Sequence, residues 1–328
     1  MLSPHFNLKK TYFLIAGIAG VNPRVGTIND VAFSRYTVQV ALQYEFDARD
    51  IPSNFSTGYV PQGAQAPDQY PKTLYGTEVF ELNDDLRQYV YNLTKNIQLK
   101  DTPISANYRL NYRAPEPNIY KEAARPPKIL KCDVACSDVY FSGTLLSEAF
   151  DNTTRLLTNG SGIPCMTAQE DNATLEPMLR FAQYKLIDFS RIIIMRSAAD
   201  FDRPYPGLSN IANLFYVNQG SFISSIENLY VVGMPVVKTI LNQWKTVFEK
   251  GIEPSNYIGD IFGTLGGKPD FGPGEGFVQS NPVSAYEPVD LPSRKRGEDT
   301  LESRYAGMTR ADIYKKKRAF VGEGEGLF

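Results

Sequence analysis

The sequence predicts an α/β protein, a three-layer α/β/α sandwich. Two short, almost wholly apolar runs, Lys10–Ala19 and Arg191–Arg196 (RIIIMR), have the character of buried central strands. Two longer segments, Glu81–Ile97 and Ile223–Lys250, instead repeat their apolar residues at helical spacing. Strands that alternate with helices favour a sheet covered by helices on both faces.

Further strands are expected beside the two central ones. Val31–Phe33 and Thr37–Val40 are short runs with branched or aromatic residues, and Ile129–Phe141 has the same character. The run Lys10–Ala19 leads into Gly17-Ile18-Ala19-Gly20, where glycines let another backbone or a ligand approach closely. We therefore expect a glycine turn at the carboxyl end of a central strand.

Four helices are expected. In Glu81–Ile97, Asn83 is a candidate N-cap, and Leu86, Val90 and Leu93 share one face. Thr144–Leu157 is read as helix or turn, and Ala168–Asp188 as a helix despite Pro177. The last helix, Ile223–Lys250, is expected to kink at Pro235. Its apolar face comprises Ile226, Leu229, Val232, Val236, Ile240 and Trp244.

The remaining segments read as loops and a tail. Asp47–Lys72 and Thr102–Pro127 are rich in proline and polar residues, which predicts long loops. After Gly274 branched apolar residues become scarce and basic clusters alternate with acidic residues. We therefore expect a domain over residues 1–275 and a low-complexity, disordered tail over residues 276–328, with a nucleic-acid or nuclear address as the minority alternative.

Composition excludes several classes of function. Lys and Arg number 34 against 36 Asp and Glu, so no basic excess points to nucleic acid. The single histidine, His5, leaves little for a Ser-His-Asp or Cys-His mechanism, and three cysteines alone build neither a disulfide framework nor a tetrahedral zinc site. The longest apolar runs are about half of the roughly 20 residues that a membrane span needs. We expect no membrane span, no metal and no cofactor.

Asn-x-Ser/Thr sequons occur at five positions, Asn54, Asn92, Asn152, Asn159 and Asn172, where chance predicts roughly two. No secretory signal peptide is visible in the chain. One interpretation is chance in an asparagine-rich sequence. The other is a secreted or cell-surface glycoprotein.

Three further places could carry chemistry, each with a structural alternative. Glu170 and Asp171 begin a predicted helix, where the helix dipole alone favours acids. Asp200 and Asp202 follow the most buried strand, at the sheet edge where ligands bind in α/β proteins. Tyr140, in Cys136–Phe141 at another strand end, could cover a flat ring or belong to the core.

Together these segments resemble the fungal purine nucleoside permease family over residues 1–275. The stretches that carry the resemblance are YFLIAGIAGVNPRVGT, VQVALQYEFDAR, TLYGTEVFELNDDLR, CDVACSDVYFSG, TRLLTNGSGIPCMTAQEDNATLEPMLR, DFSRIIIMRSAADFDRPYPG and NYIGDIFGTLGGKPDFGPG. More distantly, the order of these landmarks is similar to the nucleoside phosphorylase and nucleosidase superfamily, and the glycine turn to plant bark storage proteins. Against that superfamily the chain looks incomplete at its N-terminus.

The resemblance implies roles for the candidate residues. Glu170 would accept hydrogen bonds from the ribose hydroxyls, Tyr140 would stack on the purine, and Asp200 would bond purine N7 and, in an enzyme, protonate it. Substrate contacts are also expected from Gly17, Ala19 and Gly20 at the glycine turn, and from Arg196 on the buried strand.

Two substitutions bear on catalysis. Ile18 and Ala199 stand where the superfamily enzymes carry serines, and the first of these serines contacts phosphate or water. Phosphorolysis is therefore the weakest option. The family name implies binding and uptake of purine nucleosides; the alternatives are hydrolytic cleavage of the glycosidic bond with Asp200 as general acid, and a non-catalytic storage protein. The sequence leaves open whether the chain forms a homo-oligomer.

Overall fold

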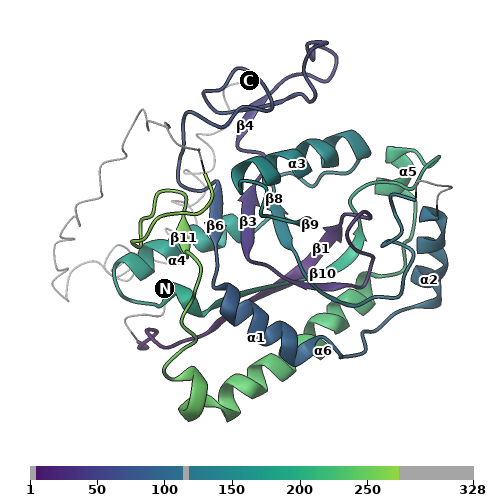
Figure 1. Cartoon of the computed structure of the whole chain (residues 1–328). Helices are drawn as coiled ribbons and strands as arrows, with labels where there is room; N and C mark the ends of the chain where they lie inside the picture. Colours follow the sequence, from purple (N-terminus) through teal and green to yellow (C-terminus); the bar gives the residue numbers. More distant parts are fainter. Residues whose placement is uncertain (1–4, 114–117, 273–328) are drawn as a thin grey trace, which may run out of the picture. The chain divides into compact units, whose positions relative to one another are not determined.

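The computed structural model describes residues 5–113 and 118–272. Within them, nine strands form one mixed sheet and two more form a small hairpin (Figure 1). The main sheet has the order β11 (Gly259–Asp260), β6 (Val79–Glu81), β3 (Tyr36–Gln39), β8 (Asp133–Cys136), β9 (Pro164–Ala168), β1 (Phe13–Val21), β10 (Ile192–Phe201), β2 (Val31–Phe33) and β7 (Ile129–Lys131). The hairpin pairs β4 (Gln43–Glu45) with β5 (Tyr59–Pro61).

The predicted α/β class is confirmed by this sheet and the helices that cover it. The helices of the described residues are α1 (Asp84–Thr94), α2 (Pro103–Arg109), α3 (Thr144–Leu157), α4 (Asp171–Gln183), α5 (Asn210–Phe215) and α6 (Phe222–Asn242), with short turns η1 (Leu110–Tyr112), η2 (Phe189–Arg191) and η3 (Trp244–Phe248). Helices α1 and α6 pack against one face of β10 and α4 against the other. Helix α3 packs with β3 and β8, on the face of β8 opposite α4.

Strand β10 shows why the sheet is covered on both faces. Successive side chains of a strand point to opposite faces. Ile192 and Ile194 accordingly pack in one apolar cluster with α4, whereas Ile193 and Met195 pack in another with α1 and α6. A strand that is apolar on both faces needs helices on both, as its continuous apolar run predicts.

The two central strands, β1 and β10, pair in parallel from Phe13 opposite Ile192 to Val21 opposite Phe201. The register shifts at Ala19 and Gly20, which is a bulge at the carboxyl end. Strand β10 runs to Phe201, five residues beyond the predicted end at Arg196. Asp200 therefore lies on the strand itself, because the pairing with β1 continues past the apolar run that marked the strand in the sequence.

Several predicted elements differ from the observed ones. The predicted loop Thr102–Pro127 contains α2, because Thr102 caps the helix by accepting from the Ser105 N–H and Pro103 occupies its first turn. The predicted loop Asp47–Lys72 contains β5. In α6, Ile226 is exposed rather than buried, and the helix gives way at Gln243 to the π-helical turn η3.

Helix α1 follows the prediction closely. Asn83 is its N-cap and accepts a hydrogen bond of 3.0 Å from the Leu86 N–H. Its side-chain amide also donates to the carbonyls of Ser190 and Ile252, which ties the start of α1 to two distant segments. Leu86 and Val90 are buried as expected, but Leu93 is exposed at the edge of the apolar face.

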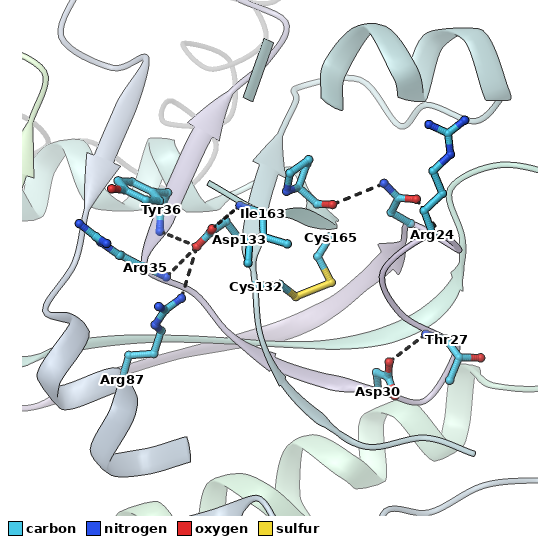
Figure 2. Close-up of a disulfide and its surroundings, with 12 residues drawn as sticks. Arg24, Thr27, Asp30, Arg35, Tyr36, Arg87, Cys132, Asp133, Ile163 and Cys165 are labelled. Atoms are coloured by element: carbon cyan, nitrogen blue, oxygen red, sulfur yellow. Dashed lines mark hydrogen bonds and ion pairs between the residues drawn. A yellow bond between two sulfur atoms is a disulfide. The ribbon is translucent and has the colours of Figure 1, made fainter. Parts of the chain in front are cut away.

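A disulfide joins Cys132, between β7 and β8, to Cys165 on β9 (Figure 2). Both cysteines are buried, and their Cα atoms lie 5.7 Å apart. The adjacent Asp133 accepts hydrogen bonds from the N–H groups of Arg35, Tyr36 and Ile163, so this part of the sheet is fixed by a covalent bond and a buried carboxylate. The third cysteine, Cys136, is a buried free thiol.

Among the described residues, no helix combines the length and the apolar character that a bilayer crossing requires. The predicted tail, residues 276–328, lies outside the residues that the structure describes.

Candidate functional site

A cavity of about 470 Å³ opens at the carboxyl ends of β1 and β10. Its volume lies within the range of small-molecule sites. The walls come from the end of β1, the segment after β8, the start of α4, the end of β10 and the segment from α5 to the start of α6. Five predicted site residues line it: Ala19, Gly20, Tyr140, Glu170 and Asp200.

Gly20 leaves space for two side chains that line the cavity, Thr167 and Asp200. A Cβ atom on Gly20 would lie 2.6 Å from Oγ1 of Thr167 and 2.8 Å from Oδ1 of Asp200, closer than any side chain tolerates. Its N–H donates to Oγ1 of Thr167 over 2.9 Å. The sequence predicted a turn at this glycine pair, but these residues belong to β1, which continues to Val21 with a bulge at Ala19 and Gly20. Glycine at position 20 is still required, because it permits the close approach.

Asp200 and Tyr140 form a hydrogen bond across the cavity, in which the tyrosine hydroxyl donates to Oδ2 of the carboxylate. Burial raises the pKa of the Asp200 carboxyl to about 6; the Tyr140 hydroxyl opposes the rise, and the charge of Asp202 adds to it. Burial and the neighbouring Asp200 raise the pKa of Tyr140. Tyr140 keeps 58% of its surface exposed, so its ring lies at the cavity mouth.

Asp200 and Asp202, two residues apart, have different surroundings. Asp202 is buried against Arg203, whose guanidinium donates two hydrogen bonds of 2.8 Å to its carboxylate. In the described part of the chain, no Lys or Arg forms an ion pair with Asp200. Asp200 is therefore the carboxyl of this pair that is available to a ligand.

Arg196 holds the start of α4 from behind the cavity wall. It is 4% exposed, bonds the carboxylate of the fully buried Asp171, and forms an ion pair of 3.0 Å with Glu170. Burial alone would lower the pKa of Arg196, but the charges of Asp171 and Glu170 raise it. Glu170 keeps 64% of its side chain exposed, so Arg196 leaves its carboxylate open to the cavity.

Gly17 and Arg196 do not line the cavity, although both were expected to contact substrate. A Cβ on Gly17 would collide with the Arg196 guanidinium. Gly17 thus provides space for Arg196, and Arg196 orients Glu170. Ile18 and Ala199, which stand in place of serines, both line the cavity with apolar groups.

Sequence reasoning missed a polar wall formed by Asn213 and Gln219. Gln219 accepts a 2.9 Å hydrogen bond from the Phe201 N–H, and its amide donates to Oδ1 of Asn213. Asn213 also accepts from the Tyr108 hydroxyl and donates to Oγ of Ser142. The local sequence around these two residues does not indicate that they form a wall of the cavity, because most of their hydrogen-bond partners come from distant segments.

The lining of the cavity is acidic. It contains Glu170, Asp200 and Asp202, and no Lys, Arg or His among the described lining residues. Nowhere in the described residues do three or more His, Cys, Asp or Glu side chains gather as they would around a metal ion.

Comparison with known proteins places the chain in a family. The family profile described as "Purine nucleoside permease (NUP)" matches residues 1–253. A purine nucleoside permease of Candida albicans is 44% identical over 279 residues, which cover 83% of this chain and 67% of the relative.

The chain belongs to the purine nucleoside permease family.

A probable purine nucleoside permease of Schizosaccharomyces pombe is 37% identical over 255 residues, covering 74% of this chain and 70% of the relative. The resemblance to this family that the sequence motifs carry is thereby confirmed.

Solved structures with a partial likeness are nucleosidases. A 5'-methylthioadenosine/S-adenosylhomocysteine nucleosidase from Helicobacter pylori aligns with a TM-score of 0.35 and 14% identity, covering 69% of this chain and 67% of that one. The Streptococcus pneumoniae MTA/SAH nucleosidase aligns with a TM-score of 0.37 and 13% identity, covering 72% of each. Overlaps of this size carry no argument about the activity of this permease-family chain.

Proposed function

We propose that the cavity binds a purine nucleoside and that this binding is the chain's part in nucleoside uptake. The observation that carries the proposal is the meeting of Tyr140, Glu170 and Asp200 in one cavity of about 470 Å³. An aromatic ring, an exposed carboxylate and a partly buried carboxyl suit the base, the ribose hydroxyls and a ring nitrogen of a nucleoside. The names of the Candida albicans and Schizosaccharomyces pombe relatives support uptake as the setting.

The charge of the lining favours a nucleoside over a nucleotide. The amino ends of α4 and α6 reach the cavity wall and contribute partial positive charge, roughly half an elementary charge each. Glu170 and Asp200 outweigh that contribution, and no basic side chain among the described lining residues would compensate a phosphate. A phosphate group would therefore enter against net negative charge.

Calorimetric titration tests this function directly. Inosine and adenosine should bind saturably at pH 7, and adenosine monophosphate should bind at least tenfold more weakly. Absence of nucleoside binding would contradict the proposal. Equal affinity for the monophosphate would contradict the charge argument alone.

A second function is favoured by the state of Asp200. Its pKa of about 6 lies near neutral pH, where a carboxyl can act as a general acid. Protonation of a purine nitrogen would let the base leave as a neutral molecule, and water would then complete hydrolysis of the glycosidic bond. General acid catalysis of this kind contributes about 10²–10⁴ in rate.

The two functions differ in what accumulates with inosine. A binder returns intact inosine after long incubation, whereas a nucleosidase releases hypoxanthine, which chromatography detects. Asp200→Asn distinguishes them further, because an amide can hydrogen-bond the purine but cannot protonate it. In a nucleosidase it should abolish base release and leave affinity within a few-fold.

A further inference from the structure

The five sequons differ sharply in their surroundings. Asn54 lies between β4 and β5, Asn92 on α1, Asn152 on α3, and Asn159 in the turn that follows α3; all four are exposed. The fifth asparagine, Asn172 on α4, is only 2% exposed. All five match the sequon pattern equally well in the sequence, but in the fold four of the asparagines are exposed and one is buried.

Asn172 is held by the sheet that it faces. Its Nδ2 donates a hydrogen bond of 2.8 Å to the carbonyl of Thr77, with the carbonyls of Thr37 and Glu78 at 3.5 Å. A sugar on this nitrogen would need space that the packed interior lacks. A chain modified at Asn172 could not close α4 onto β3 and β6.

The buried disulfide is an independent observation about the chain's surroundings. Cys132 and Cys165 are 1% and 2% exposed, and their bond fastens the β7–β8 connection to the start of β9 (Figure 2). Disulfides form and persist in oxidising compartments and are rare in the reducing cytosol. In eukaryotic cells, the compartment that forms disulfides is also the one that glycosylates asparagine.

We propose that this chain matures in an oxidising secretory compartment and carries N-linked glycans on Asn54, Asn92, Asn152 and Asn159 but not on Asn172. At each modified site the asparagine Nδ2 forms a bond to the anomeric carbon of a lipid-linked oligosaccharide. The bond from that carbon to the diphosphate oxygen breaks, the lipid diphosphate leaves, and Nδ2 loses one proton.

The four glycans would leave the cavity open. None of the four asparagines lines it. Enzymatic removal of glycans should therefore leave affinity for inosine unchanged within twofold. This inference is independent of the proposed nucleoside binding, because site occupancy is read from peptides and not from ligand affinity.

Peptide mass spectrometry of the protein purified from the cells that make it tests the sites. Treatment with peptide N-glycosidase in heavy-oxygen water converts each glycosylated asparagine to a labelled aspartate. Label is expected at Asn54, Asn92, Asn152 and Asn159. A label on Asn172 would overturn the proposal, and so would the absence of label from any one of the other four asparagines.

Thiol alkylation of the same preparation tests the compartment. In denaturant without reductant, only Cys136 should be alkylated, and after reduction all three cysteines should react. Alkylation of all three before reduction would overturn the oxidised assignment. The Cys136→Ala variant is the matched control, since it should show no alkylation before reduction and two alkylated cysteines after it.

Discussion

At the scale of single residues, the proposed nucleoside binding depends on two carboxyl groups in different environments. Glu170 is exposed and forms an ion pair with Arg196, whereas Asp200 is partly buried beside a tyrosine hydroxyl. The sequence placed both at the ends of elements, where the sheet edge brings them together. It could not predict the Tyr140–Asp200 hydrogen bond, because the orientation of side chains in a turn after a strand leaves no periodic signal.

Glu170→Ala should lower the affinity for inosine at least tenfold. In the proposed binding mode, the change removes charge-assisted hydrogen bonds to the ribose, each worth roughly 1.5–3 kcal/mol. Calorimetric titration gives the comparison, with Glu176→Ala as control, since Glu176 pairs with Arg180 further along α4. Unchanged affinity in Glu170→Ala would remove Glu170 from the site.

Asp200→Asn should change how stability depends on pH. Burial raises the Asp200 pKa from 3.8 to about 6, so the folded state holds this proton more tightly than the unfolded chain does. The stability that the protonated form contributes is complete below about pH 4 and is lost as pH rises through about 6. The wild type should therefore lose roughly 2–3 kcal/mol of unfolding free energy between pH 4 and pH 7 that Asp200→Asn does not lose.

Urea unfolding of both proteins at pH 4 and pH 7 measures this difference. Asp138→Asn, which alters an exposed carboxyl two residues before Tyr140, is the control and should show a smaller change. A wild-type-to-variant difference that does not vary with pH would contradict the raised pKa of Asp200.

At the scale of elements, apolar periodicity predicted the strands and helices that pack on the core. Strand β1, helix α3 and the cap of α1 follow from such local patterns. The pattern was wrong at the margins of the apolar faces, where Leu93 and Ile226 are exposed. It also missed α2, whose capping threonine and first-turn proline lie in a segment that is polar overall.

Asn83→Ala should destabilise the fold by about 1–3 kcal/mol. The substitution removes the cap of α1 and leaves the carbonyls of Ser190 and Ile252 without the amide that donates to them. Chemical unfolding measures the loss. Ser209→Ala, at the exposed cap of the six-residue α5, is the matched control and should cost less; equal costs would show that the tertiary bonds of Asn83 add nothing.

At the scale of the whole molecule, the sequence predicted an α/β domain and located the edge of the sheet where the cavity lies. The disulfide and the Asn213–Gln219 wall could not be predicted, since both join segments that only the tertiary structure brings together. Cysteines 33 residues apart give no local sign of pairing. Most of the features that could not be predicted from the sequence are therefore contacts between residues that are far apart in the chain.

Deletion of residues 276–328 should leave the melting temperature of the remainder nearly unchanged. The deleted segment is poor in branched apolar residues, and Phe271 is the last described residue of the apolar core. Thermal unfolding of the shortened and full chains gives the comparison. A large fall in melting temperature would show that the segment packs against the domain.

The most direct measurement for nucleoside binding is a crystal structure of the protein with an uncleavable purine nucleoside analogue. We predict that the analogue occupies the cavity at the ends of β1 and β10, with its ribose hydroxyls on Glu170 and its base between Tyr140 and Asp200. An analogue that binds saturably in solution but lies elsewhere in the crystal, or that contacts neither carboxyl group, would contradict it.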